Sequence, residues 1–317
     1  MKALITGGAG FIGSTLADRL LADGWSVDVA DDLSSGSLAN LAGARAVGDR
    51  RFSFHRIDIR NAAVSDLIET RKPDVVFHLA AQADVRVSVA RPQFDAEVNI
   101  IGTLNVCQGA IAAGARKVVF ASSGGTMYGT PEEIPTPETH PQRPESPYGV
   151  AKKAGGDYLF YYQQIHGLEF AATAFANVYG PRQDPHGEAG VVAIFTGLFL
   201  DRKRPTIFGD GEQTRDFVFV DDVVDALARA GERGNGVINI GTGVETSVNE
   251  LYASMARATK SAHEPSYAPA RVGELARSAL DVRRAESELG WKPFTSLDEG
   301  VARTLDWFRE RRGQRRG

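Results

Sequence analysis

Two side chains one helical turn apart, Tyr148 and Lys152, have the residue types and spacing that best suit catalysis in this sequence. At that spacing both side chains lie on one face of a helix, so the lysine ammonium is placed beside the phenol. A nearby positive charge favours the phenolate and lowers the pKa of a tyrosine from its usual value of about 10. Such a tyrosine can act as a general base on an alcohol while hydride leaves the same carbon for a nicotinamide. The alternative interpretation is a solvated Tyr/Lys pair on a helix surface.

This chemistry needs a nicotinamide cofactor, and the start of the chain has the pattern of a dinucleotide-binding turn. An apolar run at residues 3–5 is followed by the sequence Gly-Gly-Ala-Gly-Phe-Ile-Gly at 7–13 and then by leucines at helical spacing. Glycines allow the tight turn, the approach of backbone amides to a pyrophosphate and close packing of the helix on the sheet. The helix N-terminus then presents unpaired N–H groups and a partial positive charge to the phosphates. The residues expected at the cofactor in this turn are Gly7, Gly10, Phe11, Ile12 and Gly13.

Two carboxylates after the next apolar run indicate which dinucleotide binds. Asp31 and Asp32 follow Gly13 at about the 20-residue distance where an acidic residue accepts hydrogen bonds from the adenosine ribose. A 2′-phosphate would meet their negative charge, and no arginine follows before Arg45. The sequence therefore favours NAD over NADP.

The composition argues against several other classes of protein. The chain has 317 residues, of which 43% are hydrophobic and 24% charged, as expected of a globular protein with a substantial core. The net charge of −4 creates no strong field toward nucleic acid or an anionic membrane. The single cysteine, Cys107, excludes an intramolecular disulfide, the histidines lack metal-ligand spacing, and no apolar run approaches membrane-spanning length. We therefore expect a cytoplasmic protein without a metal, a nucleic-acid partner or a membrane association.

Alternating strand and helix patterns must position the catalytic groups. After the opening unit, apolar strand patterns occupy residues 52–59, 75–79, 117–121 and 170–174, and helical patterns occupy 99–113 and 148–166. This alternation is typical of a parallel sheet covered on both faces. The prediction is an α/β protein with a doubly wound Rossmann sheet.

The alternation ends near residue 177, which indicates a second structural unit. Residues 217–222 and 237–240 look like strands that return to the sheet. The simplest architecture joins an NAD-binding Rossmann domain to a smaller, interleaved substrate lobe. The predicted domain comprises 1–176 plus 217–241, and the predicted lobe comprises 177–216 plus 242–317.

Motifs along almost the whole chain resemble the extended short-chain dehydrogenase/reductase family. Besides the glycine turn, Asp31 and the Tyr148/Lys152 pair, the matching positions are Asp58, 78–81, Ser122-Ser123, Tyr128-Gly129, 177–183, 208–211, 214–218, 239–243 and Asp281. Each motif alone is weak, but their common order is specific. Within the family the chain is similar to nucleotide-sugar epimerases, especially UDP-glucose (UDP-galactose) 4-epimerases of actinobacterial and archaeal type.

The resemblance implies an isomerase that acts on a UDP-sugar with tightly bound NAD. Tyr148 would take the proton of the C4 hydroxyl as hydride leaves C4, and hydride would return to the other face of the 4-keto sugar. Alternatives are 4-epimerases of UDP-N-acetylglucosamine or UDP-glucuronate and, from a different class, a non-catalytic NAD sensor. A sensor would be free to lose Tyr148 and Lys152, so their presence counts against it. The resemblance also implies a homodimer formed through the helices at 99–113 and 148–166.

The resemblance assigns further residues to the two ligands. Those expected around NAD are Asp58, Ile59, Leu79, Ala80, Ala81, Asn99 and Ser122, together with Tyr148 and Lys152. Those expected around the UDP-sugar are Asn177, Val191, Phe208, Arg215, Arg271, Glu274 and Ser278. Arg215 and Arg271 are expected on the diphosphate, since guanidinium groups suit phosphate oxygens.

Ser278 implies a broad sugar pocket, because some epimerases carry a bulky tyrosine at this wall and thereby exclude an N-acetyl group at C2. We therefore expect UDP-N-acetylglucosamine to be accepted along with UDP-glucose. Arg277, the preceding residue, leaves a competing possibility that the pocket favours a C6 carboxylate.

Gly124 departs from the family pattern, which usually has a serine or threonine here whose hydroxyl bonds the reacting sugar oxygen. Glycine cannot supply this bond, so Ser123 and Thr126 are the candidates to replace it. Ser123 is preferred narrowly, because the neighbouring glycine pair could let the loop move inward. Related dehydratases and decarboxylases resemble one another in carrying an acid just before the Val/Met-Tyr-Gly of this motif, where this chain has Gly124, Gly125 and Thr126. That difference favours reversible oxidation and reduction at a single carbon.

Overall fold

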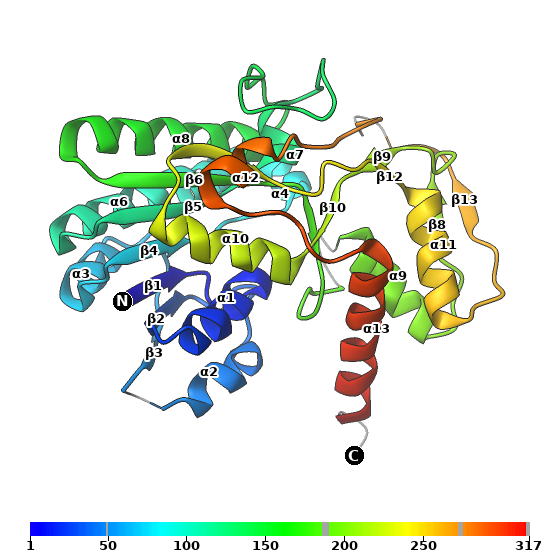
Figure 1. The fold of residues 1–317 in the computed structure, drawn as a ribbon, viewed down its shortest axis with the longest axis horizontal. Coiled ribbons are helices and arrows are strands. Elements are labelled where there is room, and N and C mark those ends of the chain that lie inside the picture. Colours follow the sequence, from blue (N-terminus) through cyan, green and yellow to red (C-terminus); the bar gives the residue numbers. More distant parts are fainter. Residues whose placement is uncertain (49, 186–189, 272–274, 315–317) are drawn as a thin grey trace.

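The centre of the structure is a seven-stranded sheet in which every pair of neighbouring strands is parallel. The computed structural model describes residues 1–48, 50–185, 190–271 and 275–314 (Figure 1). In spatial order the strands are β11 (Gly236–Ile240), β6 (Glu169–Phe175), β5 (Lys117–Ser123), β4 (Val75–His78), β1 (Lys2–Thr6), β2 (Ser26–Asp31) and β3 (Phe52–Arg56). The chain builds outward from β1 to β3 and then crosses to β4. The order therefore reverses between β1 and β4, the place where ligands bind at the carboxyl ends of strands in open α/β sheets.

Helices cover both faces of this sheet, as Figure 1 shows. On one face lie α3 (Ala63–Arg71), α6 (Gly102–Ala113) and α8 (Pro147–His166), and on the other lie α1 (Phe11–Ala22) and α10 (Val220–Glu232). Successive strand residues point to opposite faces, so each strand contributes to two cores. Along β1, Leu4 belongs to the first core, while Ala3 and Ile5 belong to the second. The predicted doubly wound Rossmann fold is confirmed.

Several predicted elements differ from the observed ones at their boundaries. The third strand ends at Arg56, so Asp58 and Ile59 lie in the loop beyond it. The helix expected from residue 99 is continuous with earlier turns: α4 (Val85–Ala90) and α5 (Pro92–Ala96) lead into a π-helical segment at Glu97–Ile101, and α6 begins at Gly102. Asn99 thus lies in a π-helical segment, a feature that is frequent at functional sites.

The prediction that residues 217–222 return to the central sheet is wrong. β10 (Phe217–Phe219) pairs instead with β7 (Asn177–Tyr179) in a separate two-stranded sheet, and α10 begins at Val220. The apolar residues at 220, 223, 224 and 227 follow helical spacing, and burial of that stripe against α1 outweighs the strand preference of valine. The second predicted return, at 237–240, is confirmed as β11.

The remaining elements lie mainly beside the carboxyl end of the sheet, on the right of Figure 1. They include α9 (Val191–Leu200), β8 (Thr206–Phe208), β9 (Thr214–Arg215), β12 (Thr246–Ser247), α11 (Val248–Thr259), β13 (Ser266–Ala268) and α13 (Leu297–Gln314). α12 (Arg283–Leu289) packs against α10 and β11 instead. The two-part division of the chain into domain and lobe stays a prediction.

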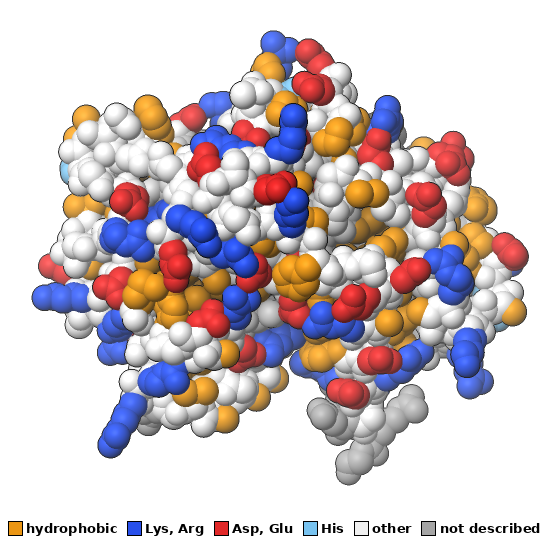
Figure 2. Space-filling view, in the orientation of Figure 1, with side chains coloured by type: hydrophobic (Ala, Val, Ile, Leu, Met, Phe, Trp, Pro, Cys, Tyr) orange, Lys and Arg blue, Asp and Glu red, His pale blue; other side chains and the backbone are white. Residues whose placement is uncertain are grey.

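The surface has charges of both signs. Figure 2 shows Lys and Arg side chains interspersed with Asp and Glu over the face in view, with hydrophobic side chains between them. Among the helices in the described ranges, none combines the length and apolar character needed to cross a membrane.

Candidate active site

The turn between β1 and α1 is packed so closely that side chains would not fit at its glycines. Gly7 has a backbone φ of +69°, and its N–H donates to the carbonyl oxygen of Ala30 at 2.9 Å. A Cβ atom on Gly7 would lie 2.6 Å from the nitrogen of Ala80, and one on Gly13 would collide with the carbonyl oxygen of Gly7. Gly10, before the first residue of α1, has no side chain to cap the helix. The turn therefore fits a phosphate group held by backbone amides.

Asp31 ties this turn to the end of β2. Its carboxylate accepts hydrogen bonds from the backbone N–H groups of Ala9 and Leu33 at 2.9 and 2.8 Å. Burial raises the pKa of Asp31, and the two backbone hydrogen bonds oppose that rise. Asp32 follows at the end of the strand and accepts from the N–H of Ser34. The structure thus brings Asp31 to the glycine turn, as the predicted cofactor site requires.

Asp58 and Ile59 lie just past the end of β3, at the same edge of the sheet. Arg60 holds the Asp58 carboxylate through its Nε at 2.9 Å, and this hydrogen bond lowers the pKa of Asp58. Ile59 is buried against Gly102, where an added Cβ would lie 2.6 Å from the Ile59 Cδ1. Arg60 was not recognised as a site residue from the sequence, although its charge two residues after the aspartate was a visible signal.

A buried histidine joins the strands on either side of the switch point. The Nδ1 of His78 lies 2.7 Å from the hydroxyl of Thr6, and its Nε2 lies 3.0 Å from the hydroxyl of Thr103. Burial lowers the pKa of His78 to about 3, so the ring is neutral at physiological pH. His78 therefore links β1, β4 and α6 directly beneath the loop at Leu79, Ala80 and Ala81.

Asn99 holds the backbone at Gln82, which follows the loop at residues 79–81. Its side chain donates to the carbonyl oxygen of Gln82 at 2.9 Å and accepts from the N–H of the same residue at 2.9 Å. It also donates to the carboxylate of Asp95 at 2.9 Å, which in turn accepts from the Gln82 side chain at 3.0 Å. Gln82 and Asp95 were missed in the sequence, because no local motif reveals a network between a loop and a helix.

The Tyr148/Lys152 pair lies in the first turns of α8, as predicted. Ser146 caps this helix by accepting from the N–H of Gly149 at 3.1 Å. The Lys152 Nζ lies 5.6 Å from the centre of the Tyr148 ring and donates to the carbonyl oxygen of Ala121 at 2.8 Å. Lys152 is only 3% exposed, so the interpretation as a solvated surface pair is wrong. Burial lowers the pKa of Lys152 to about 8, against the opposing charge of Asp95.

The loop after β5 carries the two candidate hydroxyl groups. Ser123 is half-buried and directly precedes α7 (Gly124–Met127), to which its side chain gives no capping hydrogen bond. Thr126 Oγ1 is enclosed by protein atoms and has no hydrogen-bond partner among the described residues. Ser122 is buried, and its hydroxyl lies 3.7 Å from the sulfur of Met127. A Cβ on Gly149 would lie 2.6 Å from the Thr126 carbonyl oxygen, which shows that α7 packs against the start of α8.

The structure brings together part of the predicted UDP-sugar site. The Arg271 guanidinium stacks 4.1 Å from the centre of the Phe208 ring. Arg215 donates to the carbonyl oxygen of Leu275 at 2.8 Å, which ties β9 to the segment that leads to Ser278. The other expected contacts are the exposed Asn177 at the start of β7, Val191 at the start of α9 and the half-buried Ser278. Glu274 lies outside the described residues.

Arg277 is engaged by a carboxylate of the protein itself. Its Nε donates to Glu245 at 2.9 Å, and this contact lowers the pKa of Glu245. Glu245 also accepts from the hydroxyl of Thr214 in β9. The Arg277 guanidinium thus already has a carboxylate partner within the protein, and the competing preference for a C6 carboxylate stays a prediction.

Comparison with known proteins identifies the family. Residues 4–304 match the family model described as GDP-mannose 4,6 dehydratase. The chain belongs to this family. A UDP-glucose 4-epimerase of Mycolicibacterium smegmatis is 52% identical over 313 residues, which are 98% of this chain and 99% of that relative. The predicted membership of the extended short-chain dehydrogenases/reductases is therefore confirmed.

Solved structures of this family are similar along the whole chain. A UDP-glucose 4-epimerase of Thermotoga maritima, crystallised with UDP-glucose, is 45% identical with a TM-score of 0.93. The similarity covers 98% of this chain and 99% of that one. A UDP-glucose 4-epimerase of Thermus thermophilus in complex with NAD is 41% identical with a TM-score of 0.89, and the similarity covers 98% and 99% of the two chains.

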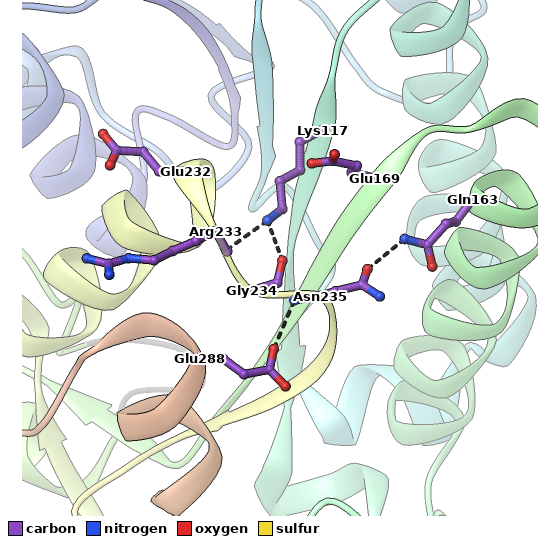
Figure 3. A pocket seen from close by; sticks show the side chains of 8 residues that line it. All are labelled: Lys117, Gln163, Glu169, Glu232, Arg233, Gly234, Asn235 and Glu288. Carbon is purple, nitrogen blue, oxygen red and sulfur yellow. Dashed lines mark hydrogen bonds between the residues drawn. The ribbon is translucent and has the colours of Figure 1, made fainter.

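A hollow lies away from the carboxyl edge, at which ligands bind in open α/β sheets (Figure 3). Lys117, at the start of β5, is buried there and donates to the carbonyl oxygen of Arg233 at 2.8 Å. The N–H of Asn235 donates to Glu288 in α12 at 3.1 Å. Because Lys117 is used to hold the chain between α10 and β11, we assign a structural role to this cluster.

Proposed function

We propose that this protein is a UDP-glucose/UDP-galactose 4-epimerase that uses tightly bound NAD. The observation that carries the proposal is the buried Lys152 beside the Tyr148 ring, in a sheet whose switch point holds the glycine turn and Asp31. The close relatives from Mycolicibacterium smegmatis, Thermotoga maritima and Thermus thermophilus support the same activity.

The residues at the carboxyl edge fit a dinucleotide. Positions 7 and 13 have no room for a Cβ atom, so the turn allows close approach of a diphosphate to its backbone. We infer that Gly10, Phe11, Ile12 and Gly13 bind the diphosphate and that Asp31 and Asp32 accept from the adenosine ribose. The other residues proposed around NAD are Asp58, Ile59, Leu79, Ala80, Ala81, Asn99 and Ser122. NAD supplies a reversible acceptor for the hydride of C4.

Tyr148 is the general base of the proposed reaction. It takes the proton of the C4 hydroxyl as the C4–H bond breaks, and it returns the proton when the 4-keto sugar is reduced on its other face. The Lys152 ammonium stabilises the phenolate that accepts this proton and that is regenerated when the proton is returned. The net reaction inverts C4 without net oxidation, so no external oxidant or reductant is consumed.

A hydroxyl of the β5–α7 loop assists at the C4 oxygen in this proposal. Ser123 is the preferred group, because it lies at the carboxyl end of β5 and does not cap α7. Thr126 is the alternative, but its enclosed Oγ1 would reach a substrate only if the loop moved. Parallel Ser123→Ala and Thr126→Val variants decide between them, since only the residue that serves the sugar should lower kcat when it is changed.

Arg215 and Arg271 are proposed to bind the UDP diphosphate, with Asn177, Val191, Phe208 and Glu274 around the nucleotide. Ser278 forms a wall of the sugar pocket. Because serine leaves room beside C2, we expect UDP-N-acetylglucosamine to be turned over as well. Ser278→Tyr should suppress that substrate selectively, since a misplacement of about 1 Å can cost ~10²-fold.

A panel of UDP-sugars tests both the activity and the substrate range. Purified protein should interconvert UDP-glucose and UDP-galactose without added cofactor, and denaturation should release NAD(H). Comparing kcat/KM for UDP-glucose, UDP-N-acetylglucosamine and UDP-glucuronate before and after Ser278→Tyr separates the three sugars. Stoichiometric NADP(H) would contradict the role of Asp31 and Asp32, and absence of any turnover with bound NAD would favour a sensor.

We also propose that the protein is a homodimer formed through the helices at 99–113 and 148–166. Large hydrophobic side chains on α8 and on the π-helical segment Glu97–Ile101 are exposed to solvent, including Ile101, Val150, Tyr158, Tyr161 and Ile165. Exposed apolar surface of this kind on neighbouring elements is typical of an interface.

A further inference from the structure

In the loop after β5, the space beside Gly124 is filled by another side chain, whereas the space beside Gly125 is open. A Cβ atom on Gly124 would lie 2.5 and 2.8 Å from the two methyl carbons of Leu280. A Cβ atom on Gly125 would have no heavy atom within 4 Å, apart from its own chain neighbours and the backbone of its helix. Separations below about 3 Å are too short for carbon atoms that are not bonded, so a side chain at 124 requires Leu280 to move. A side chain at position 124 would therefore conflict with a residue from a distant segment of the chain.

Leu280 has little freedom to move aside. Its side chain is 1% exposed and packs in a small core with Met127, Tyr128 and Ala174. A leucine enclosed in this way can leave its position only by displacing other buried groups.

The backbone around Leu280 is also held on both sides. Thr136 donates to the carbonyl oxygen of Ala279 at 2.8 Å and accepts from the N–H of Asp281 at 3.0 Å. The N–H of Leu280 itself points to the buried carboxylate of Asp216 at 3.3 Å. These contacts tie Leu280 to the proline-rich loop at residues 131–147 and to Asp216, while its side chain packs against residues of α7 and β6.

We propose that Leu280 is a positioning residue of the active site. By filling the space beside residue 124, it excludes a serine from that position and makes Ser123 the residue whose hydroxyl serves the sugar. This inference rests on the proposed epimerase function. It predicts that positions 124 and 280 are coupled, so that a hydroxyl can return to 124 only when residue 280 is small.

The steric part is tested by melting temperatures of the purified full-length protein. Gly124→Ser should lower Tm by roughly 3 °C or more, because it overpacks a closed core. Gly125→Ser is the matched control, with the same chemical change one residue away in open space, and should shift Tm by about 1 °C or less. In a Leu280→Ala background the loss caused by Gly124→Ser should fall by at least about half. Equal shifts for the two serine variants, or no coupling to residue 280, would overturn the proposal.

The functional part is tested by moving the hydroxyl. Ser123→Ala should lower kcat by roughly 10²-fold in the otherwise unchanged protein, with little change in KM, because the bond matters most in the transition state. In the Gly124→Ser/Leu280→Ala background, the same Ser123→Ala change should cost less than about 10-fold, since a serine at 124 then supplies the hydroxyl. Rescue of this kind would not arise from a merely structural role.

Two results separate failure of this inference from failure of the proposed function. Equal losses on Ser123→Ala in both backgrounds, or no loss in either, would overturn the assignment of the hydroxyl while leaving the epimerase intact. If the unchanged protein turns over no UDP-sugar, the proposed function fails, and the melting comparison alone then supports or overturns the steric role of Leu280.

Discussion

At the scale of single residues, the site depends on a lysine whose burial opposes the stability of the folded protein. Lys152 is buried, its pKa is lowered to about 8 by desolvation, and its ammonium is placed beside Tyr148 by the start of α8. Burial of a charge opposes the stability of the fold. A buried lysine of this kind is therefore typical of a functional site, where the charge has a use.

The first prediction concerns the proton acceptor. Tyr148→Phe removes the phenol oxygen and leaves the ring to pack, so epimerisation should fall by at least ~10²-fold, the usual scale for a general base. UDP binding, measured by calorimetry, should barely change, because the nucleotide is proposed to contact other residues. Near-normal turnover in this variant would show that the Tyr/Lys pair is structural.

The second prediction separates the function of Lys152 from its effect on stability. The folded-state pKa near 8 lies below the ordinary value of 10.5, so the unfolded chain binds this proton more readily. The burial of Lys152 therefore opposes folding below pH 8, and that penalty is relieved as the pH rises from 8 to 10.5. Lys152→Met should lose activity by at least ~10²-fold and yet unfold at no lower denaturant concentration than the unchanged protein at pH 7.

Urea unfolding of both proteins from pH 7 to 10 checks this prediction. Any advantage of Lys152→Met should shrink above pH 8. A large loss of stability that is constant with pH would contradict the account, because it would mean that the Lys152 hydrogen bond to Ala121 outweighs the cost of burying the charge.

The sequence revealed those site residues whose roles depend on local spacing. The glycine turn, Asp31 and the Tyr148/Lys152 pair each lie within one motif, and the structure places them where strand and helix patterns predict. Gln82, Asp95 and Leu280 were not recognised, because their positions depend on contacts between distant segments. No property of Leu280 in the sequence shows that it lies against Gly124.

At the scale of elements, the strands of the central sheet were predictable because burial on both faces gives them continuous apolar runs. The prediction for residues 217–222 failed in part, because a short run of Phe and Val residues does not distinguish a strand from the start of a buried helix: 217–219 form β10 outside the central sheet, and α10 begins at Val220. The small sheets that pair β8 with β13 and β9 with β12 join residues far apart in the chain, and no local pattern predicts such pairings.

The third prediction concerns the link that His78 makes between β1, β4 and α6. Its folded-state pKa of about 3 lies below the ordinary value of 6.5, so in acid the unfolded chain takes up the proton first. His78 is therefore neutral and compatible with folding above pH 6.5, and stability is lost as the pH falls from 6.5 toward 3.

Unfolding free energies measured in urea at pH 7 and 5 test the histidine link. In His78→Asn, the decrease between the two pH values should be smaller than in the unchanged protein, even if the variant is less stable overall. His263→Asn is a suitable control, because His263 is exposed to solvent. An equal decrease in the unchanged protein and in His78→Asn would show that other groups govern acid sensitivity.

At the scale of the whole molecule, the chain leaves the Rossmann sheet after β6 and returns to it at β11, so the first part of the predicted lobe, residues 177–216, lies between two strands that are neighbours in the sheet. The later segments are also anchored to the sheet's helices. The indole N–H of Trp291 donates to the carbonyl oxygen of Asp222 in α10 at 2.9 Å, and the hydroxyl of Thr295 donates to the Asp222 carboxylate at 2.6 Å. The segment after β11 is therefore held against α10.

The fourth prediction concerns assembly through the exposed side chains of α8. Tyr161→Glu should convert the proposed dimer to a monomer, because a carboxylate would be buried against its symmetry mate in a two-fold interface. Tyr267→Glu is the matched control, since Tyr267 is a similarly exposed tyrosine on β13. Light scattering coupled to gel filtration distinguishes the two states, and a monomeric unchanged protein would refute the dimer.

The late return of β11 has a consequence for the order in which the protein can be made. During synthesis β6 leaves the ribosome well before β11. The apolar strand Glu169–Phe175 therefore has an unpaired outer edge while the residues between it and β11 are being synthesised. During that interval the nascent chain carries a template for pairing with other chains. Slow translation between Phe175 and Gly236 would lengthen the exposure, and chaperones that bind extended apolar segments would be most useful at this stage of synthesis.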